Sequence, residues 1–308
     1  MKVSVKVPAT IANLGCGFDC FGLAIPIHNI ITIEETIMPG SGIEINILGD
    51  DSQNNLENIP TDKSSIIYKA IELLYSYMGQ VPEELKIDIK TSIPVARGLG
   101  SSSSVIVGAL VAANELLGNP ADLSVLLSIA TELEGHPDNI TPALVGGITM
   151  ATQEDDGSVV YRKLPWPKEW KLMVCIPDYE LSTGISRSVL PNEVDRKDAI
   201  FNLRRTAMMV EAIHTKDEEL MKLALKDKLH EPYREKLVPT LSLLKENLKH
   251  IQGVLGCVLA GAGPSVLIIT NGTNQTEIKE VIENTYKESN VTLKLINTPI
   301  EEKGAERI

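Results

Sequence analysis

A short stretch rich in glycine and serine limits, more than any other, what this chain can fold into. It covers residues 94–104, with the sequence PVARGLGSSSS. The residues before it, 85–90, alternate like a β-strand, and those from about 102 to 117 are apolar enough for a buried helix. Glycines let a backbone approach a ligand closely, and the first N–H groups of a helix attract an anion. The pattern therefore predicts a phosphate-binding turn between a strand and a helix.

This turn differs from the Walker loop, and a plainer interpretation of it exists. No lysine precedes a serine or threonine within the segment, as the Walker pattern requires. The serine hydroxyls could donate hydrogen bonds to phosphate, or one of them could bind a metal ion. The alternative is an ordinary glycine turn with a serine cap at the start of the helix. Because a helix follows the turn directly, phosphate binding is favoured over the ordinary glycine turn.

Composition narrows the class of ligand. The 308 residues include 29 Lys and Arg against 41 Asp and Glu, which gives a formal net charge of −12. Such a surface repels nucleic-acid backbones and anionic membranes, so we expect neither as a partner. Aromatic residues make up only 4% of the chain, too few for base-stacking platforms. An anionic ligand must then be held by local groups and not by the overall charge.

Cysteine spacing and hydropathy point to a reducing compartment. The four cysteines have no two-residue spacing of the zinc or redox type, so we expect reduced thiols. Residues 1–8 alternate like a strand and lack the apolar core of a signal peptide. The longest apolar run, near residues 105–113, is far shorter than a membrane span. We therefore expect a cytoplasmic protein.

The order of the expected elements indicates the fold class. In the first half we expect strands at 3–7, 25–34, 42–48, 85–90 and 148–152, and helices at 63–78, 102–117 and 122–134. In the second half we expect strands at 171–176, 257–259, 266–270 and 291–296, and helices at 198–213, 217–229, 237–248 and 276–288. Strands and helices grouped in this way favour α+β layers over a doubly wound sheet or a barrel. Residues 153–168, which contain two prolines, are the expected linker.

A second segment with candidate chemistry, residues 134–139, lies where a helix is expected to end. Within six residues it holds Glu134, His136, Asp138 and Asn139. Magnesium bound to nucleotide phosphates takes one or two protein oxygens, and Glu134 with a serine of the glycine turn would supply them. Asp138 or Asn139 could face an acceptor hydroxyl. The alternative is a solvated polar turn.

Small residues and two arginines mark the remaining candidates. Residues 259–265 (LAGAGPS) would let a tight loop pack against another backbone, for instance beneath the phosphate turn, or simply join two strands. Arg187 and Arg234 stand in short polar motifs of an acidic chain, and each could bind a carboxylate through both ends of its guanidinium. Each could equally form a surface ion pair.

Taken together and in this order, these segments resemble the GHMP kinase family of small-molecule kinases. Residues 94–104 are similar to its phosphate-loop motif, and residues 261–265 are similar to its C-terminal glycine motif. Four further segments resemble the homoserine kinase branch of that family: residues 8–19 (PATIANLGCGFD), 136–139 (HPDN), 182–187 (STGISR) and 231–234 (EPYR). The resemblance spans nearly the whole chain.

The resemblance implies ATP and Mg²⁺ as cofactors and L-homoserine as substrate. It implies that the ATP phosphates are bound by Pro94, Val95, Ala96, Arg97, Gly98, Leu99, Gly100, Ser101, Ser102, Ser103 and Ser104. Magnesium would be held by Ser102 and Glu134, with Glu132 as the other candidate glutamate. Asn13, Asp19, Asp138 and Asn139 would line the substrate pocket, and Arg187 and Arg234 would hold the substrate carboxylate. Asp138, Asn139 and Thr183 would lie at the reacting hydroxyl, with Asp138 a weak base at most.

The resemblance also implies a fold of two α+β domains with the active site in the cleft between them. We expect an N-terminal, ribosomal-protein-S5-like domain over residues 1–160 and a C-terminal domain over residues 161–308. Two alternatives stay open: another GHMP kinase for a mevalonate-type or sugar substrate, and a non-catalytic nucleotide sensor on the same fold. A neutral sugar would not need the two arginines, and a sensor would not need the magnesium ligands. The oligomeric state is open, a homodimer included.

Overall fold

A computed structural model of the chain describes residues 1–35, 42–49, 60–82 and 84–308. Its first β-sheet contains β1 (Lys2–Ala12), β2 (Phe21–Glu35), β3 (Ile43–Leu48), β4 (Leu85–Lys90), β5 (Ile148–Gln153), β6 (Val159–Leu164) and β11 (Glu306–Arg307). The strands run in the order β11-β1-β2-β4-β3, and β5 pairs with the first residues of β2 and with β6. Every pairing in the sheet is antiparallel except that of β3 with β4. The long strand β2 therefore serves both halves of the sheet.

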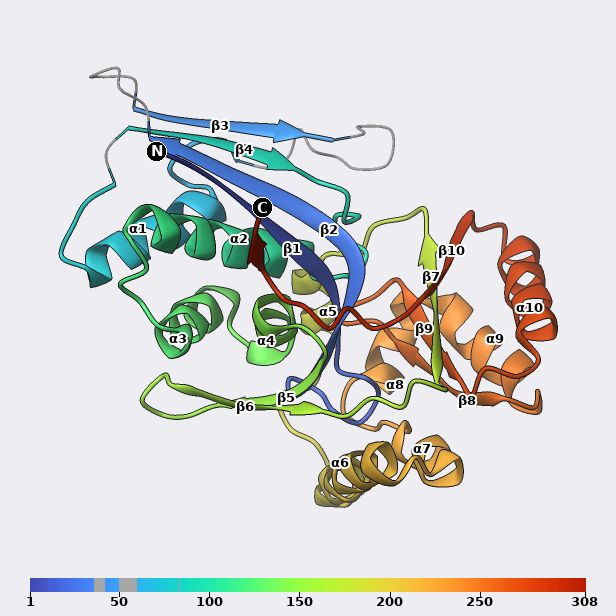
Figure 1. The fold of residues 1–308 in the computed structure, drawn as a ribbon. Coiled ribbons are helices and arrows are strands. Elements are labelled where there is room, and N and C mark those ends of the chain that lie inside the picture. Colours follow the sequence, from blue (N-terminus) through green and yellow to red (C-terminus); the bar gives the residue numbers. More distant parts are fainter. Residues whose placement is uncertain (36–41, 50–59, 83) are drawn as a thin grey trace.

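Four helices lie on one face of this sheet (Figure 1): α1 (Ile66–Tyr77), α2 (Ser101–Leu116), α3 (Leu123–Glu134) and α4 (Pro137–Val145). Alternate residues of the strands, such as Val5 and Ile33, are fully buried against them. α2 lies directly on the sheet, because a Cβ at Gly108 would come within 2.5 Å of the Ile31 side chain. This close packing fixes where the first turn of α2 lies.

The second sheet has the strand order β10-β7-β9-β8, and all its pairings are antiparallel. Its strands are β7 (Lys171–Pro177), β8 (Val254–Leu259), β9 (Val266–Thr270) and β10 (Leu293–Thr298). One face packs on α9 (Pro239–Leu248) and α10 (Gln275–Glu288). The other face packs on α6 (Arg196–Thr215), α7 (Glu218–Ala224) and the ends of β1 and β2. Three short helices complete this half: α5 (Thr183–Ser188), α8 (Glu231–Arg234) and a 3₁₀ helix over Glu235–Leu237.

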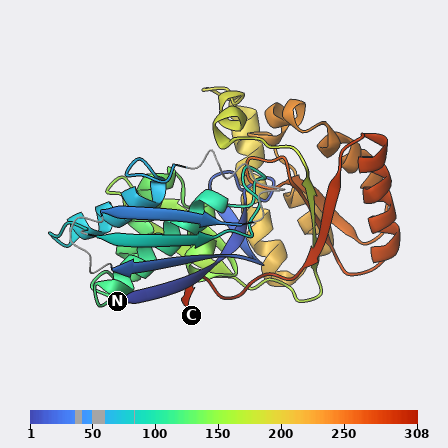
Figure 2. The same ribbon diagram turned by 90° about the horizontal axis from the view of Figure 1, so that it is seen from above.

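The two halves are joined by more than one crossing of the chain (Figure 2). The chain leaves the first sheet after β6, and its last residues return to add β11 beside β1. The Gly261 N–H also donates to the carbonyl of Ala12, which ties a loop of the second half to the end of β1. The division into domains at residues 160 and 161 stays a prediction.

The α+β class predicted from the sequence is confirmed, and most expected elements are present within a few residues. The linker expected at 153–168 was wrong, because it contains β6, which pairs with β5. The helix expected to begin at residue 63 begins at Ile66, since the Asp62 side chain accepts from the N–H of Ser64 and forms a turn. The segment 134–139 runs from the last residue of α3 to the first residues of α4, a helix that the sequence analysis missed.

No helix among the described residues is long and apolar enough to cross a membrane.

Candidate active site

A cavity of about 340 Å³ lies where the two halves of the molecule meet. Its walls come from the end of β1, the turn before α2, the first turn of α4, and α5 and α8. Nearly all of the site residues expected from the sequence line it: Asn13, Asp19, residues 94–102, Glu134, Asp138, Asn139, Thr183, Arg187 and Arg234. Segments far apart in the sequence are thus brought together in one cavity.

The turn before α2 has the geometry of an anion-binding helix start. Gly100 caps the helix in the left-handed conformation, with φ at 66°, and Gly98 has φ at 71°. The Ser104 N–H is the first to bond back into the helix, to the carbonyl of Gly100 at 2.9 Å. The N–H groups of residues 101–103 therefore precede the helical ladder at the positive end of a 16-residue helix.

The second glycine loop, residues 259–265, packs directly against this turn, as one interpretation of the sequence expected. A Cβ at Gly98 would lie 2.2 Å from the carbonyl oxygen of Ala260, so only glycine fits there without movement. The Leu181 N–H donates to the carbonyl of Ala96 at 2.9 Å, and the Thr10 N–H donates to that of Leu99 at 3.1 Å. The phosphate turn is thus held by backbone from both halves of the molecule.

This packing predicts a large effect for Gly98→Ala. The new Cβ must displace the loop at Ala260, so we expect unfolding to become easier by about 3 kcal/mol or more, with weakened ATP binding. Thermal unfolding with and without ATP measures both effects. Gly118→Ala is the matched control: its φ is also positive, at 82°, but nothing lies within 4 Å of its added Cβ. The control should lose only about 1–2 kcal/mol, and equal losses in the two variants would contradict the account.

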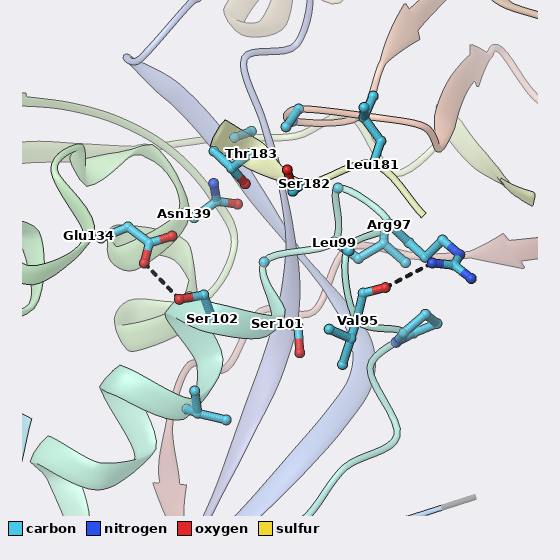
Figure 3. A pocket seen from close by; sticks show the side chains of 18 of the residues that line it. Val95, Arg97, Leu99, Ser101, Ser102, Glu134, Asn139, Leu181, Ser182 and Thr183 are labelled. Atoms are coloured by element: carbon cyan, nitrogen blue, oxygen red, sulfur yellow. Dashed lines mark hydrogen bonds between the residues drawn. The ribbon is translucent and has the colours of Figure 1, made fainter. Parts of the chain in front are cut away.

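Arg97 lies in the phosphate turn, but its side chain points away from the start of α2 (Figure 3). Arg97 is 5% exposed, and its guanidinium donates to the carbonyls of Val95, Pro177 and Asp178. Glu180 lies 3.5 Å from it. The side chain of Arg97 therefore ties the turn to the end of β7.

The side chain of Glu134, the last residue of α3, faces the first turn of α2 (Figure 3). Ser102 Oγ donates to one of its carboxylate oxygens at 3.1 Å, and Ser103 Oγ donates to the other at 2.8 Å. Hydroxyl and carboxylate oxygens beside a helix start are the hard ligands that Mg²⁺ takes next to phosphate, so the residues fit the ion. Glu132 is exposed and does not line the cavity, so the geometry favours Glu134.

The start of α4 brings His136, Asp138 and Asn139 to the same cavity. His136 Nδ1 lies 2.5 Å from Asp138 Oδ1, and Asp138 is only 1% exposed. Burial disfavours the charged imidazole, but the hydrogen bond and charge of Asp138 outweigh it and raise the pKa of His136. Asn139 Oδ1 accepts from Thr10 Oγ1 at 2.8 Å, and its Nδ2 lies 3.4 Å from Asp138.

The loop after β1 presents Asn13 and Asp19, both with positive φ. Asn13 Nδ2 donates to the carbonyl of Gly261 at 2.8 Å, so the loop is tied to the second half. Asp19 binds Arg187 of α5 through two hydrogen bonds, at 2.7 and 3.2 Å. Burial disfavours the charged guanidinium, but the pair with Asp19 outweighs it and raises the pKa of Arg187. Thr183, at the start of α5, lines the same cavity.

Arg234 is the second guanidinium in the cavity, and it is only 2% exposed. It donates to the carbonyls of Ser186 at 3.1 Å and Gly261 at 3.2 Å. Within the described residues, no carboxylate lies within ion-pairing distance of it, so its partners there are neutral. Burial and then the positive charge of Arg187 lower the pKa of Arg234 to about 10. A buried cation of this kind is stabilised by an anionic ligand.

The residues at one end of the cavity were not individually named by the sequence analysis, although the strand near residue 90, a candidate for the base pocket on the family resemblance, contributes one of them. This end is lined by apolar side chains from β3, α1, β4 and the first turns of α2: Ile47, Ile66, Ile67, Ile89 and Val105. Such residues look like ordinary core residues in a sequence, and only the fold shows that they face a cavity. An apolar slot beside an anion-binding turn suits a flat ring attached to phosphate.

Comparisons with known proteins agree with this geometry. Residues 65–147 match the family model described as GHMP kinases N terminal domain. A homoserine kinase from Microchaete diplosiphon is 38% identical over 99% of this chain and 96% of its own length. One from Carboxydothermus hydrogenoformans is 39% identical over 98% of this chain and 96% of its own length. A crystal structure of homoserine kinase from Cytophaga hutchinsonii covers the whole chain and 97% of its own, with 25% identity and a TM-score of 0.88. A mevalonate kinase crystal structure shares the fold, with 19% identity, a TM-score of 0.69, and coverage of 97% of this chain and 99% of its own.

Proposed function

The chain belongs to the homoserine kinases of the GHMP kinase family, and from that premise we propose that it transfers the γ-phosphoryl group of ATP to L-homoserine. The products are O-phospho-L-homoserine and ADP, in a step of threonine biosynthesis. The observation that carries the proposal is a single cavity that joins an anion-binding helix start to two guanidinium groups. The phosphates of ATP would be bound at the helix start, and the carboxylate of homoserine would be bound by the two guanidinium groups.

ATP fits this cavity with its base in the apolar slot and its phosphates at the start of α2. The slot begins at Ile47 and Ile89, and Ser101 and Ser102, whose N–H groups precede the helical ladder, lie at the other end. Those N–H groups and the helix dipole oppose the charge of the phosphates, which the acidic surface of the protein cannot do. Ser102 and Glu134 would hold Mg²⁺, which when bound neutralises charge on the phosphate oxygens.

Homoserine fits between Arg234 and the start of α4. Its carboxylate would meet Arg234, which lacks an anionic partner, and Arg187, which would share its charge between substrate and Asp19. Asn13 and Asp19 would line the pocket near the amino group. The hydroxyl would lie at Asp138, Asn139 and Thr183, facing the phosphates. A neutral sugar would leave Arg234 buried without an anion, and this disfavours the sugar alternative.

Catalysis by this arrangement consists mainly of positioning and charge neutralisation. Phosphoryl transfer passes through a loose transition state, so little proton removal is needed before the bond to the leaving oxygen breaks. Asp138 accepts the hydrogen bond of the homoserine hydroxyl and so directs its oxygen at the γ-phosphorus. Asn139, fixed by Thr10, keeps Asp138 in place. The N–H groups of the helix start stabilise the charge on the moving phosphoryl group.

Asp138→Asn tests how much base catalysis contributes. We expect kcat to fall by about tenfold, at the low end of what a general base supplies, because the amide still orients the hydroxyl. The pKa of His136, followed by NMR, should fall when the charge of Asp138 is removed. Because that pKa is raised in the folded protein, the pair stabilises the fold fully below pH about 6.5 and loses its contribution as pH rises through the folded value. If Asp138→Asn lowered kcat as much as replacement of the magnesium ligand Glu134 does, Asp138 would be an essential base.

The function itself is tested by ADP release with Mg²⁺ and ATP against homoserine, serine, threonine, mevalonate and galactose. We expect homoserine to have the highest kcat/KM. Preference for mevalonate or galactose would select another kinase of the family. Nucleotide binding without turnover of any acceptor would select the sensor, which the presence of Ser102 and Glu134 disfavours.

A further inference from the structure

A fully buried imidazole, that of His230, connects two walls of the substrate pocket. Its Nε2 lies 2.8 Å from the carbonyl oxygen of Gly15, in the loop that carries Asn13 and Asp19. Its Nδ1 lies 3.3 Å from Nη1 of Arg234. None of the roles proposed above uses this side chain.

The two partners fix the protonation of the ring. A carbonyl oxygen only accepts a hydrogen bond, so Nε2 must carry the proton. A guanidinium only donates, so Nδ1 must be unprotonated and accept from Arg234. His230 is therefore neutral, with one tautomer selected by its neighbours. It acts here as an acceptor that sets the direction of one Arg234 N–H.

The backbone that carries the ring is held by a buried carboxylate. Asp227 accepts from the N–H groups of Leu229, His230 and Glu231, at 2.8 to 3.1 Å, and from Asn202 Nδ2 at 2.6 Å. These bonds fix the backbone at the start of α8, four residues before Arg234. Asp227 Oδ2 lies 3.7 Å from Nε2 of His230, beyond hydrogen-bond distance.

Phe18 lies at the junction of these groups. Its ring stacks on His230 with a centroid separation of 5.2 Å and an angle of 21° between the planes. The guanidinium carbons of Arg234 and Arg187 lie 5.3 and 5.6 Å from its centroid. At these distances the ring attracts both cations and so favours the position that the Arg234 guanidinium takes.

We propose that His230 and Phe18 are positioning residues that aim the guanidinium of Arg234 into the pocket, and so determine how well the carboxylate of homoserine is bound. The proposal rests on the function proposed above, and it adds two side chains that contact no reacting atom. Burial of the positively charged Arg234 guanidinium costs free energy whichever way the side chain points. Its neutral partners at Ser186, Gly261 and His230 leave the remaining N–H groups for the substrate.

The test uses two substitutions that each keep one half of the imidazole. His230→Gln keeps a donor for the Gly15 carbonyl but loses the acceptor for Arg234. His230→Asn keeps an acceptor near Nδ1 and loses the donor. We expect His230→Gln to raise the KM of homoserine by about tenfold or more, as for a lost hydrogen bond to a charged group. The KM of ATP and kcat should stay within about threefold, and His230→Asn should lie closer to the wild type.

A double-mutant cycle tests whether the effect passes through Arg234. In an Arg234→Lys background, His230→Gln should raise the homoserine KM by much less than it does alone, because the guanidinium that His230 orients is no longer present. Additive effects, or a KM of ATP that rises as much as that of homoserine, would overturn the proposal. Phe18→Leu provides a second route should His230→Gln fail to fold: it should raise the homoserine KM alone, and an unchanged KM would again overturn it. A wild-type protein that does not phosphorylate homoserine would instead refute the proposed function.

Discussion

Replacing Glu134 by glutamine is expected to lower kcat by about 100- to 1,000-fold without unfolding the protein. Glutamine keeps the volume of the side chain, and its amide oxygen can still accept from one of the two serine hydroxyls while its amide N–H donates to the other. It lacks the negative charge that a magnesium ligand supplies beside the phosphates. Activity measured over a range of Mg²⁺ concentrations should show a higher requirement for the ion.

Glu132→Gln is the matched control, since it makes the same chemical change two residues earlier on the same helix. Glu132 is exposed and does not line the cavity, so its replacement should leave kcat and the Mg²⁺ requirement unchanged. If Glu132→Gln were the damaging change and Glu134→Gln the silent one, the assignment of the metal ligand would be wrong. Thermal unfolding of both variants separates loss of activity from loss of fold.

Replacing Arg187 by alanine is expected to raise the KM of homoserine by about 100-fold and to leave that of ATP nearly unchanged. A hydrogen-bonded charge pair in a partly buried pocket contributes about this much when one partner is removed. Part of the loss comes from Asp19, which without Arg187 becomes an unpaired negative charge beside the substrate carboxylate. Steady-state kinetics with each substrate varied in turn measures the two KM values.

Arg204→Ala is the control for the change in net charge. Arg204 is exposed on α6 and does not line the cavity, so both KM values should stay at the wild-type level. Equal increases in the KM of homoserine and of ATP in Arg187→Ala would contradict a role confined to the carboxylate.

Local periodicity explains why much of the fold could be predicted. The alternation at residues 85–90 correctly predicted both ends of β4, and the apolar run after Ser101 predicted most of α2. The segment Gly135-His136-Pro137 contains residues that often break helices, and it concealed the start of α4. Proline is accepted at the first position of a helix, where its missing N–H costs nothing, so the helix begins there.

The parts of the site that escaped prediction depend on contacts between distant segments. Nothing local to Arg97 indicates that its side chain turns toward the end of β7 and away from the start of α2. The pair of Asp19 and Arg187 joins residues 168 positions apart. His230 follows a stretch expected to be helical to residue 229, whereas α7 ends at Ala224 and leaves room for the turn at Asp227. Only the assembled fold shows such relations.

The most direct test of the account is a crystal structure with Mg²⁺, a non-hydrolysable ATP analogue and homoserine. The account predicts phosphate oxygens within hydrogen-bond distance of the N–H groups of residues 101–103, with the homoserine carboxylate on Arg234. A triphosphate bound elsewhere, away from the first turn of α2, would contradict the claim that this helix start holds the nucleotide of an acidic protein.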